Sequence, residues 1–221
     1  GDVTRVFAAL VPPADVVAHL QVALAALPGA QVGELAPPRG RGGQRGQAAR
    51  PTLRWGDPAQ WHVTVAFYGE IAEGAVPGLT AALGEAVGAL QAPTLRLRGA
   101  GSFGGRNLWV GVAPEGPGDA RSLSALLETS AAVGDVVGAD LRADLERRDR
   151  RRAHLTLARV AAGARRHARA PEELTAVVRA LAVYEGPRWR PDEVALVASE
   201  LGAGRSGGPL HRVIAELPLA P

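Results

Sequence analysis

Two short stretches of this chain share one pattern, and the shared pattern limits the possible folds more than any other feature of the sequence. Residues 62–67 read His-Val-Thr-Val-Ala-Phe, and residues 154–159 read His-Leu-Thr-Leu-Ala-Arg, at an offset of 92 residues. Each stretch alternates polar and aliphatic side chains, which is typical of a strand with one buried face. We therefore expect the histidine and the threonine of each strand to share a face, with the aliphatic side chains in the core.

The two strands occupy the same place in two similar series of elements. Hydrophobic periodicity predicts strand, helix, strand, helix and strand over residues 3–100 and again over residues 107–201. The expected strands lie at 3–11, 61–67, 94–100, 107–113, 153–160, 193–201 and 211–217. Between them we expect helices after Pro13, from Val76 to Leu90, around Leu123 and Leu127, and from Pro171 to Leu181. The repetition suggests an internal duplication with a pseudo-twofold axis.

Composition excludes several classes of protein. With 221 residues, 47% of them hydrophobic, the chain is long enough for one large domain or two small lobes, and a disordered tail protein is excluded. The sequence contains no run of eighteen apolar residues and no secretion signal, so we expect a cytoplasmic protein outside the membrane. It contains no cysteine, which removes disulfides, thiolate zinc sites and cysteine nucleophiles.

The charge is segregated along the chain although the net charge is only +3. All 25 basic residues are arginine; five of them lie between Leu35 and Gly56 without an acid, and ten lie between Arg142 and Arg169 against three acids. Arginine pairs well with phosphate oxygens, and a positive field attracts polyanions. The Arg- and Gly-rich residues 37–50 lack apolar periodicity and are expected to form a flexible loop. Composition alone fits equally well with arginines that merely solvate two loops.

The paired strands carry the groups that displacement at phosphorus requires. If the two halves meet about a twofold axis, His62 and His154 approach a common cleft from opposite sides, where one can accept a proton and the other donate one. Thr64 and Thr156 can donate hydrogen bonds to the phosphate oxygens, and Arg159 can neutralise their charge. Arg159 has the opposite strand parity to His154, so the strand must twist or end before this side chain can reach the cleft.

Two rival interpretations of the histidines are weaker. Strand histidines are often structural, but two in matching contexts argue against coincidence. A zinc site is also conceivable for paired histidines, but the chain has no cysteine and no His-Glu-x-x-His helix, and neither motif brings a carboxylate. We therefore expect no metal and no other cofactor.

The sequence resembles the 2H phosphoesterases, among them the bacterial and archaeal RNA 2′,3′-cyclic phosphodiesterases that were historically called 2′-5′ RNA ligases. The resemblance covers most of the chain and is carried mainly by the two His-x-Thr stretches. It extends to Trp61 before the first stretch and to Tyr68-Gly69-Glu70 after it. Weaker similarity is found in the segments 5–12, 99–104, 108–112 and 196–199.

The resemblance implies a fold and an activity. The fold would be α+β, with two pseudo-symmetric lobes whose antiparallel sheets flank a central cleft and whose helices lie on the outside, all in one domain of residues 1–221. The activity would be metal-independent hydrolysis of an RNA terminal 2′,3′-cyclic phosphate to a 2′-phosphate, with His62 as proton donor and His154 as proton acceptor. The residues themselves do not assign these two roles.

The resemblance also implies substrates and further contacts. The substrates would be RNA ends or small cyclic nucleotides, acted on by a monomer, with Arg159 and Phe7 as substrate-binding residues. Phe7 would stack on a base, although burial in the core is the more common fate of such a residue. His211 stands where the family commonly has tyrosine, and we expect it to be structural or at the rim. His19 and His167 are expected to be solvated.

Two other functions stay open at this point. The first is 2′-5′ RNA ligation, or hydrolysis of another cyclic or 2′-5′-linked nucleotide, by the same groups. The second belongs to a different class, a non-catalytic RNA-binding module in which the duplicated strands are only a scaffold. The sequence does not identify the physiological RNA.

Overall fold

The computed structural model describes residues 1–27, 52–136, 138, 152–163, 171–204 and 208–221. The expected flexible loop at 37–50, much of the second Arg-rich stretch and His167 lie outside these residues. None of the helices in the described part of the chain is long and apolar enough to cross a membrane.

The described residues form strands and helices close to those that the periodicity predicts. Two single 3-10 turns, Pro58–Gln60 and Glu73–Ala75, interrupt the series. In chain order, the elements are β1 (Val3–Leu10), α1 (Ala14–Ala25), β2 (Leu53–Trp55), β3 (Val63–Ala72), α2 (Val76–Gly88), β4 (Leu95–Gly101), β5 (Asn107–Pro114), α3 (Pro117–Val136), β6 (His154–Val160), α5 (Glu172–Ala180), β7 (Glu193–Glu200) and β8 (Leu210–Pro218). The short strand β2 has no counterpart among the expected elements.

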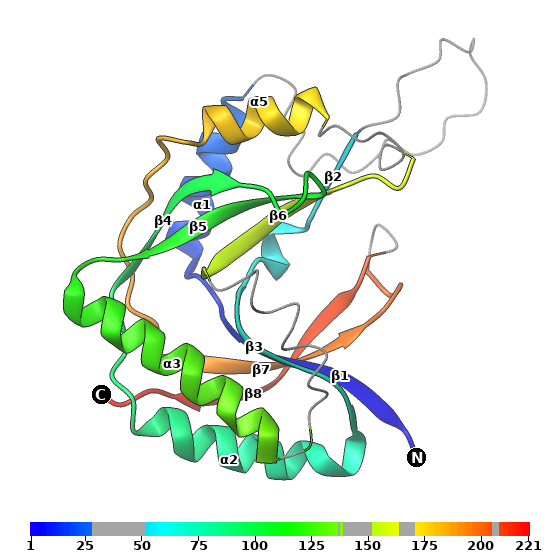
Figure 1. The fold of residues 1–221 in the computed structure, drawn as a ribbon, viewed down its shortest axis with the longest axis vertical. Coiled ribbons are helices and arrows are strands. Elements are labelled where there is room, and N and C mark those ends of the chain that lie inside the picture. The colour runs from blue at the N-terminus through cyan, green and yellow to red at the C-terminus, as the bar shows by residue number, and fades with distance from the viewer. Residues whose placement is uncertain (28–51, 137, 139–151, 164–170, 205–207) are drawn as a thin grey trace.

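All the strand pairings are antiparallel, in the order β4-β5-β6-β3-β1-β7-β8, and β2 also pairs with β6. The curled sheet has an upper half of β2, β4, β5 and β6 and a lower half of β1, β3, β7 and β8 (Figure 1). The halves join where β3 meets β6, at the pair Val63 and Leu155. The predicted α+β class with antiparallel sheets is confirmed.

Each half of the sequence contributes a strand to the other half of the sheet. β1 and β3 pair with each other, and β7 from the second series lies on the other side of β1. Likewise β5 and β6 pair with each other, and β4 from the first series lies on the other side of β5. This exchange ties the two series together, whereas the internal duplication itself stays a prediction.

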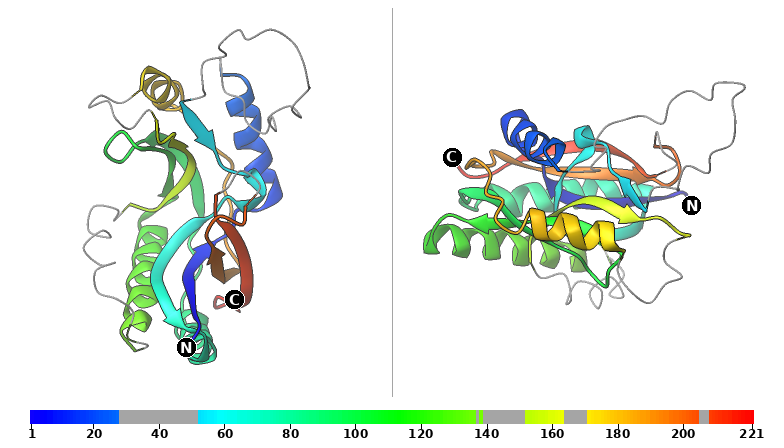
Figure 2. Two further views of the ribbon diagram at one scale, coloured as in Figure 1. Left: turned by 90° about the vertical axis from the view of Figure 1, so that its right-hand side faces the viewer. Right: turned by 90° about the horizontal axis from the view of Figure 1, so that it is seen from above.

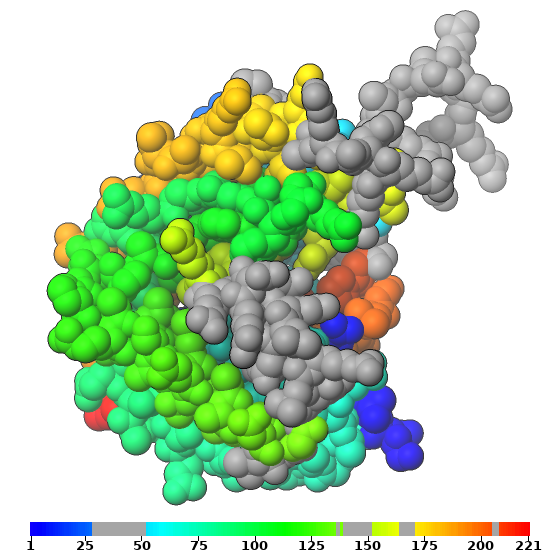
Figure 3. Space-filling view, in the orientation of Figure 1, coloured from blue at the N-terminus to red at the C-terminus, as the bar shows by residue number. Residues whose placement is uncertain are grey.

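The helices lie on the outside of the sheet. Figure 2 shows α1 and α5 in the upper half and α2 and α3 in the lower half, and α2 and α3 form much of the lower surface in the space-filling view (Figure 3). The phenol of Tyr68 on β3 donates a hydrogen bond of 2.8 Å to the carbonyl of Ser130 on α3. Because Tyr68 is only 1% exposed, this bond fixes α3 on the core face of β3.

One continuous core fills the space between the sheet and the helices. Its β1 members are Val6, Ala8 and Leu10, which alternate with residues of the opposite face. On that opposite face, which we call the inner face, Phe7 and Ala9 form a small second cluster with Ala195 and Val197 of β7. The candidate catalytic side chains must therefore be sought on the inner face.

The junction of the halves predicts a stability test. Leu155 is fully buried there, so Leu155→Ala should lower the free energy of unfolding by about 2–5 kcal/mol through lost burial and the cavity left behind. Urea denaturation followed by circular dichroism measures the loss. Leu201→Ala is the matched control because Leu201 is 70% exposed, and it should change stability by less than about 0.5 kcal/mol. Equal effects of the two substitutions would contradict this account of the junction.

Candidate active site

The first motif presents its polar groups on one face of β3. His62 is half-buried and Thr64 is exposed, whereas Val63 and Val65 are buried in the core. The register places Thr64 opposite Ala9 of β1, which belongs to the inner face. The expected sharing of a face by His62 and Thr64 fits this burial pattern.

The second motif repeats the arrangement on β6. His154 and Thr156 are half-buried, and Leu155 and Leu157 are fully buried. Thr156 lies opposite Trp109 of β5, and the Trp109 ring packs near His154, with 6.0 Å between the ring centroids. The second histidine and threonine therefore share a face as well.

The junction pair brings the two motifs together. Val63 and Leu155 are 92 residues apart, and so they hold the same position in the two motifs. An antiparallel pair of equivalent residues is locally twofold symmetric. His62 and His154 each precede their member of this pair by one residue, and the charge of His154 acts on His62. The structure thus brings together the two motifs that lie far apart in the sequence.

Both imidazoles are oriented by the same backbone contact. Nδ1 of His62 lies 2.9 Å from the carbonyl oxygen of Gln60, and Nδ1 of His154 lies 2.9 Å from that of Arg152. A carbonyl oxygen can only accept a hydrogen bond, so the proton of each neutral ring is on Nδ1. In each neutral ring Nε2 is then the nitrogen that can take up a proton.

A β-bulge follows each threonine and moves the third residue after it onto the inner face. Between the pairs Ala9–Thr64 and Ala8–Ala66, β3 holds one extra residue, Val65. Between Trp109–Thr156 and Leu108–Ala158, β6 holds the equivalent extra residue, Leu157.

The bulge in β6 resolves the parity difficulty at Arg159. Leu157 and Ala158 are both buried, and Arg159 is exposed directly after them, so the alternation of faces is reset within the strand. Arg159 therefore projects from the same face as His154 and Thr156. The expected twist or end of the strand is replaced by one inserted residue.

The two histidines have different aromatic neighbours. The His62 ring centroid lies 4.8 Å from that of Phe7 and 5.0 Å from that of His211, whereas the His154 ring lies 4.9 Å from Phe103. Phe7 is only 5% exposed, so its ring packs against His62 and offers little surface to a ligand. The near-symmetry of the motifs does not extend to the side chains around them.

His211, which we expect to be structural or at the rim, packs directly beside His62. Its ring packs edge-on against both Phe7 and His62, with centroids 5.1 Å and 5.0 Å away. The backbone N–H of His211 donates a 3.4 Å hydrogen bond to Oε1 of Gln60, the residue whose carbonyl holds His62. Only the pairing of β8 with β7 brings His211 here, and no local sequence pattern signals a contact over such a separation.

The environment makes the protonated form of His62 unfavourable. Burial is the main cause that lowers the pKa of His62 from 6.5 to about 4, and the charges of His211, His154 and Arg159 lower it further. The hydrogen bond to the Gln60 carbonyl acts in the opposite direction. Burial and then Arg159 also lower the pKa of His211. Arg159 therefore exerts its positive charge on the inner face, and His62 is neutral at neutral pH.

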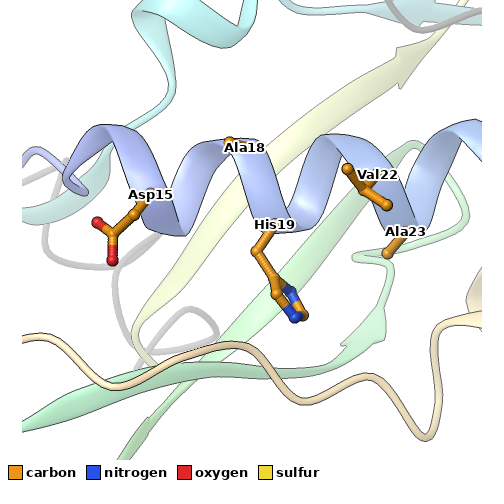
Figure 4. Close-up of a pocket in the computed structure, with 5 residues that line it drawn as sticks. All are labelled: Asp15, Ala18, His19, Val22 and Ala23. Carbon is orange, nitrogen blue, oxygen red and sulfur yellow. The ribbon is translucent and has the colours of Figure 1, made fainter.

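Other polar features lie apart from the two motifs. Among the described residues, no group of three or more histidine, aspartate or glutamate side chains is placed to hold a metal ion. His19 is exposed on α1, as expected, and its Nδ1 lies 2.9 Å from the Tyr184 hydroxyl. Figure 4 shows the open hollow beside it, which is lined by Asp15, Ala18, His19, Val22 and Ala23 and contains no residue of either motif.

Part of the sequence matches a model of a known protein family. A family model described as LigT like Phosphoesterase matches residues 41–112, which include the first motif. No curated protein matches the sequence significantly. The second motif lies outside the matched residues, so its place in the site comes from the structure.

Solved structures match over nearly the whole chain. E. coli LigT complexed with 3′-AMP is 19% identical, with a TM-score of 0.64 and 100% of both chains covered. E. coli LigT complexed with phosphate is 18% identical, with a TM-score of 0.62 and the same coverage. The protein TT0787 of Thermus thermophilus is 26% identical, with a TM-score of 0.59 and 97% of each chain covered. The predicted resemblance to the LigT-like phosphoesterases of the 2H superfamily is confirmed by the family match and the shared fold.

The electrostatics of the site predict a measurable shift. Because a positive neighbour disfavours a charged imidazole, Arg159→Gln should raise the pKa of His211, which burial and then Arg159 lower. It should raise the pKa of His62 above about 4 by only a small amount, because burial is the main cause of that lowered pKa. Titration of the imidazole 15N signals by NMR measures both groups. Arg190→Gln serves as control; an unchanged or lowered pKa of His211 in Arg159→Gln would contradict the assignment.

Proposed function

We propose that this protein hydrolyses the 2′,3′-cyclic phosphate at an RNA terminus to a 2′-phosphate, with His62 and His154 as the acid–base pair. The observation that supports the proposal is the junction of β3 and β6, where equivalent residues of the two motifs pair and where each imidazole is held through Nδ1 by the carbonyl two residues before it. Displacement at phosphorus needs proton transfer on two opposite sides, and this arrangement supplies one group for each.

In the proposed reaction, a water molecule attacks the phosphorus while the 3′-oxygen leaves on the opposite side. Nε2 of neutral His154 takes the proton from the water as its oxygen bonds to phosphorus. Nε2 of protonated His62 gives its proton to the 3′-oxygen as the bond between phosphorus and that oxygen breaks. The products are a 2′-phosphate and a free 3′-hydroxyl, and the two histidines end with their protonation states exchanged.

The charge of the substrate is what makes His62 an acid in this scheme. In the empty site His62 is neutral at neutral pH because its pKa is lowered to about 4. A phosphodiester anion beside the ring favours the imidazolium form and raises the pKa of His62. Binding of the anion and loading of the proton are therefore coupled, and the enzyme is expected to be protonated at His62 chiefly when substrate is present.

The remaining predicted residues have supporting roles in the proposal. The hydroxyls of Thr64 and Thr156 donate hydrogen bonds to the two non-bridging oxygens, which carry more charge in the transition state. The Arg159 guanidinium neutralises part of that charge from the same face. The Phe7 ring packs against the His62 ring at a centroid distance of 4.8 Å. Contact of Phe7 with a terminal base stays a prediction, and such a base would meet only the exposed rim of the phenyl ring.

The same groups would serve the related reactions. If a 5′-hydroxyl of a second RNA replaces water, the attack forms a 2′-5′ linkage and the protein acts as a ligase; small cyclic nucleotides fit the same chemistry. Chromatography of the products from RNA with a cyclic phosphate end, from 2′-5′ oligonucleotides and from small cyclic nucleotides separates these reactions. A non-catalytic RNA-binding module would bind RNA and form no product from any of them.

The proposal includes the setting of the reaction. The arginines that are concentrated in two segments of the sequence support an RNA substrate, because clustered positive charge attracts polyanions. We further propose that the protein acts as a cytoplasmic monomer and needs no metal ion or other cofactor. Activity in the presence of a strong chelator tests the last point directly, and its loss would contradict it.

Removal of either imidazole should abolish most of the activity. His62→Ala and His154→Ala should each lower turnover of a 2′,3′-cyclic phosphate by roughly 10²–10⁴-fold, because each removes one of the two proton transfers. Turnover is measured by separating the 2′-phosphate product chromatographically. His19→Ala is the matched control, since His19 lies on α1 away from both motifs. Full activity in both single variants would contradict the proposal. So would a loss of turnover in His19→Ala equal to that in His62→Ala and His154→Ala.

Each threonine is expected to act through its hydroxyl rather than its shape. Thr156→Val keeps the volume but removes the donor, and it should lower kcat by roughly 10–10³-fold with a smaller effect on KM. Thr156→Ser keeps the hydroxyl and should restore most of the rate. Thr64 is equivalent by position and should behave in the same way. If valine and serine were equally active, the hydroxyl would have no part in the transition state.

A further inference from the structure

Three polar residues lie side by side on β2, β6 and β5. Arg159 of β6 is the register partner of Arg54 on β2 and of Asn107 on β5. Directly opposed residues of antiparallel strands project from the same face of a sheet. Arg54, Arg159 and Asn107 therefore form a row across three adjacent strands, which we call the arginine row.

The arginine row is on the inner face. The next pair along β2 and β6, Leu53 and Val160, is buried in the core at 3% and 2% exposure, so the neighbouring position must face the other way. On β5, Leu108 is fully buried, and Trp109, two residues after Asn107, packs near His154 on the inner face. The row thus continues the surface that carries the second motif.

The row offers donors for an anion. Arg54 and Arg159 are exposed, and guanidinium groups bind phosphate oxygens with paired donors. Oδ1 of Asn107 accepts a 2.8 Å hydrogen bond from the backbone N–H of Phe103, which leaves the amide NH2 of Asn107 as the donor end.

Most of the arginine row lies too far from the two histidines to contact the reacting phosphate. Arg159 follows His154 by five residues, so at about 3.3 Å per residue, with one residue lost to the bulge, it lies roughly 13 Å along the strand. The long side chain of Arg159 can point back towards the reacting phosphate. Arg54 and Asn107, on the flanking strands, are placed for a second anion.

We propose that Arg54 and Asn107, on the two strands that flank Arg159, bind a phosphate on the 5′ side of the reacting nucleotide. This inference rests on the proposed function and names its substrate class, an RNA chain in preference to a mononucleotide. In RNA that ends in a 2′,3′-cyclic phosphate, every other phosphate lies on the 5′ side. A mononucleoside 2′,3′-cyclic phosphate has no group for the row, whereas a dinucleotide supplies one.

The preference for a dinucleotide tests the arginine row. We compare kcat/KM for adenosine 2′,3′-cyclic phosphate and for the adenylyl dinucleotide with the same cyclic end. In the wild type the dinucleotide should be preferred. Arg54→Gln should lower the ratio of kcat/KM for the dinucleotide to kcat/KM for the mononucleotide by about 3–10-fold, because a charge-assisted contact to the extra phosphate is lost. Arg190→Gln, another exposed arginine, should leave the ratio unchanged.

A second variant separates binding from folding. Asn107→Asp keeps the acceptor for the Phe103 N–H but replaces the amide donor with a carboxylate oxygen, so the ratio should fall while the thermal melting temperature stays near that of the wild type. If Arg54→Gln and Asn107→Asp reduced kcat/KM equally for both substrates, or left the ratio unchanged, the arginine row would not bind a second phosphate.

Direct binding distinguishes failure of the row from failure of the proposed reaction. Anisotropy of a fluorescein-labelled hexa-adenylate is measured at several salt concentrations. Loss of one phosphate contact in Arg54→Gln should reduce the slope of log K against log salt by about 0.7, and Arg190→Gln should not. If the wild type hydrolyses neither substrate, the proposed function fails, and this slope alone decides the inference: an unchanged slope overturns it.

Discussion

The candidate site depends on a single antiparallel contact, the pairing of Val63 with Leu155. Both side chains are fully buried, so the core favours this register over a slip by one residue, which would turn both motifs towards the helices. Because the paired residues are equivalent in their motifs, the contact also creates the local twofold relation of the two imidazoles. The apolar residues between the polar ones thus determine where the chemistry can occur.

Backbone geometry repeats around this contact, and side-chain surroundings do not. Each histidine is held by the carbonyl two residues before it, and each threonine is followed by an inserted residue. Yet His62 packs against Phe7 and His211, while His154 packs against Phe103. An acid and a base need different surroundings, and the two imidazoles have them although the same backbone contact holds each ring. The lowered pKa of His62 makes its protonation depend on an anion, and this links proton loading to substrate binding.

Local pattern and periodicity were enough to predict the strands, the helices and the face that each motif presents. The bulges are hinted at by the adjacent apolar pairs Val65-Ala66 and Leu157-Ala158, but a strict period of two hides them. β2 has only three residues, too few for any periodicity. The exchange of β4 and β7, and the approach of His211 to His62, arise from long-range pairing that no local pattern contains. The residues at 37–50 and His167 lie outside the described part of the chain.

The central claim is that the two imidazoles flank one phosphorus, and a crystal structure with a nucleoside 2′,3′-vanadate tests it most directly. Vanadate takes the trigonal bipyramidal form of an in-line displacement. The account predicts the vanadium between the histidines, with one apical oxygen in hydrogen-bond distance of Nε2 of His62 and the other of Nε2 of His154. An ordered vanadate that contacts only one of these nitrogens, or that binds elsewhere on the chain, would contradict it.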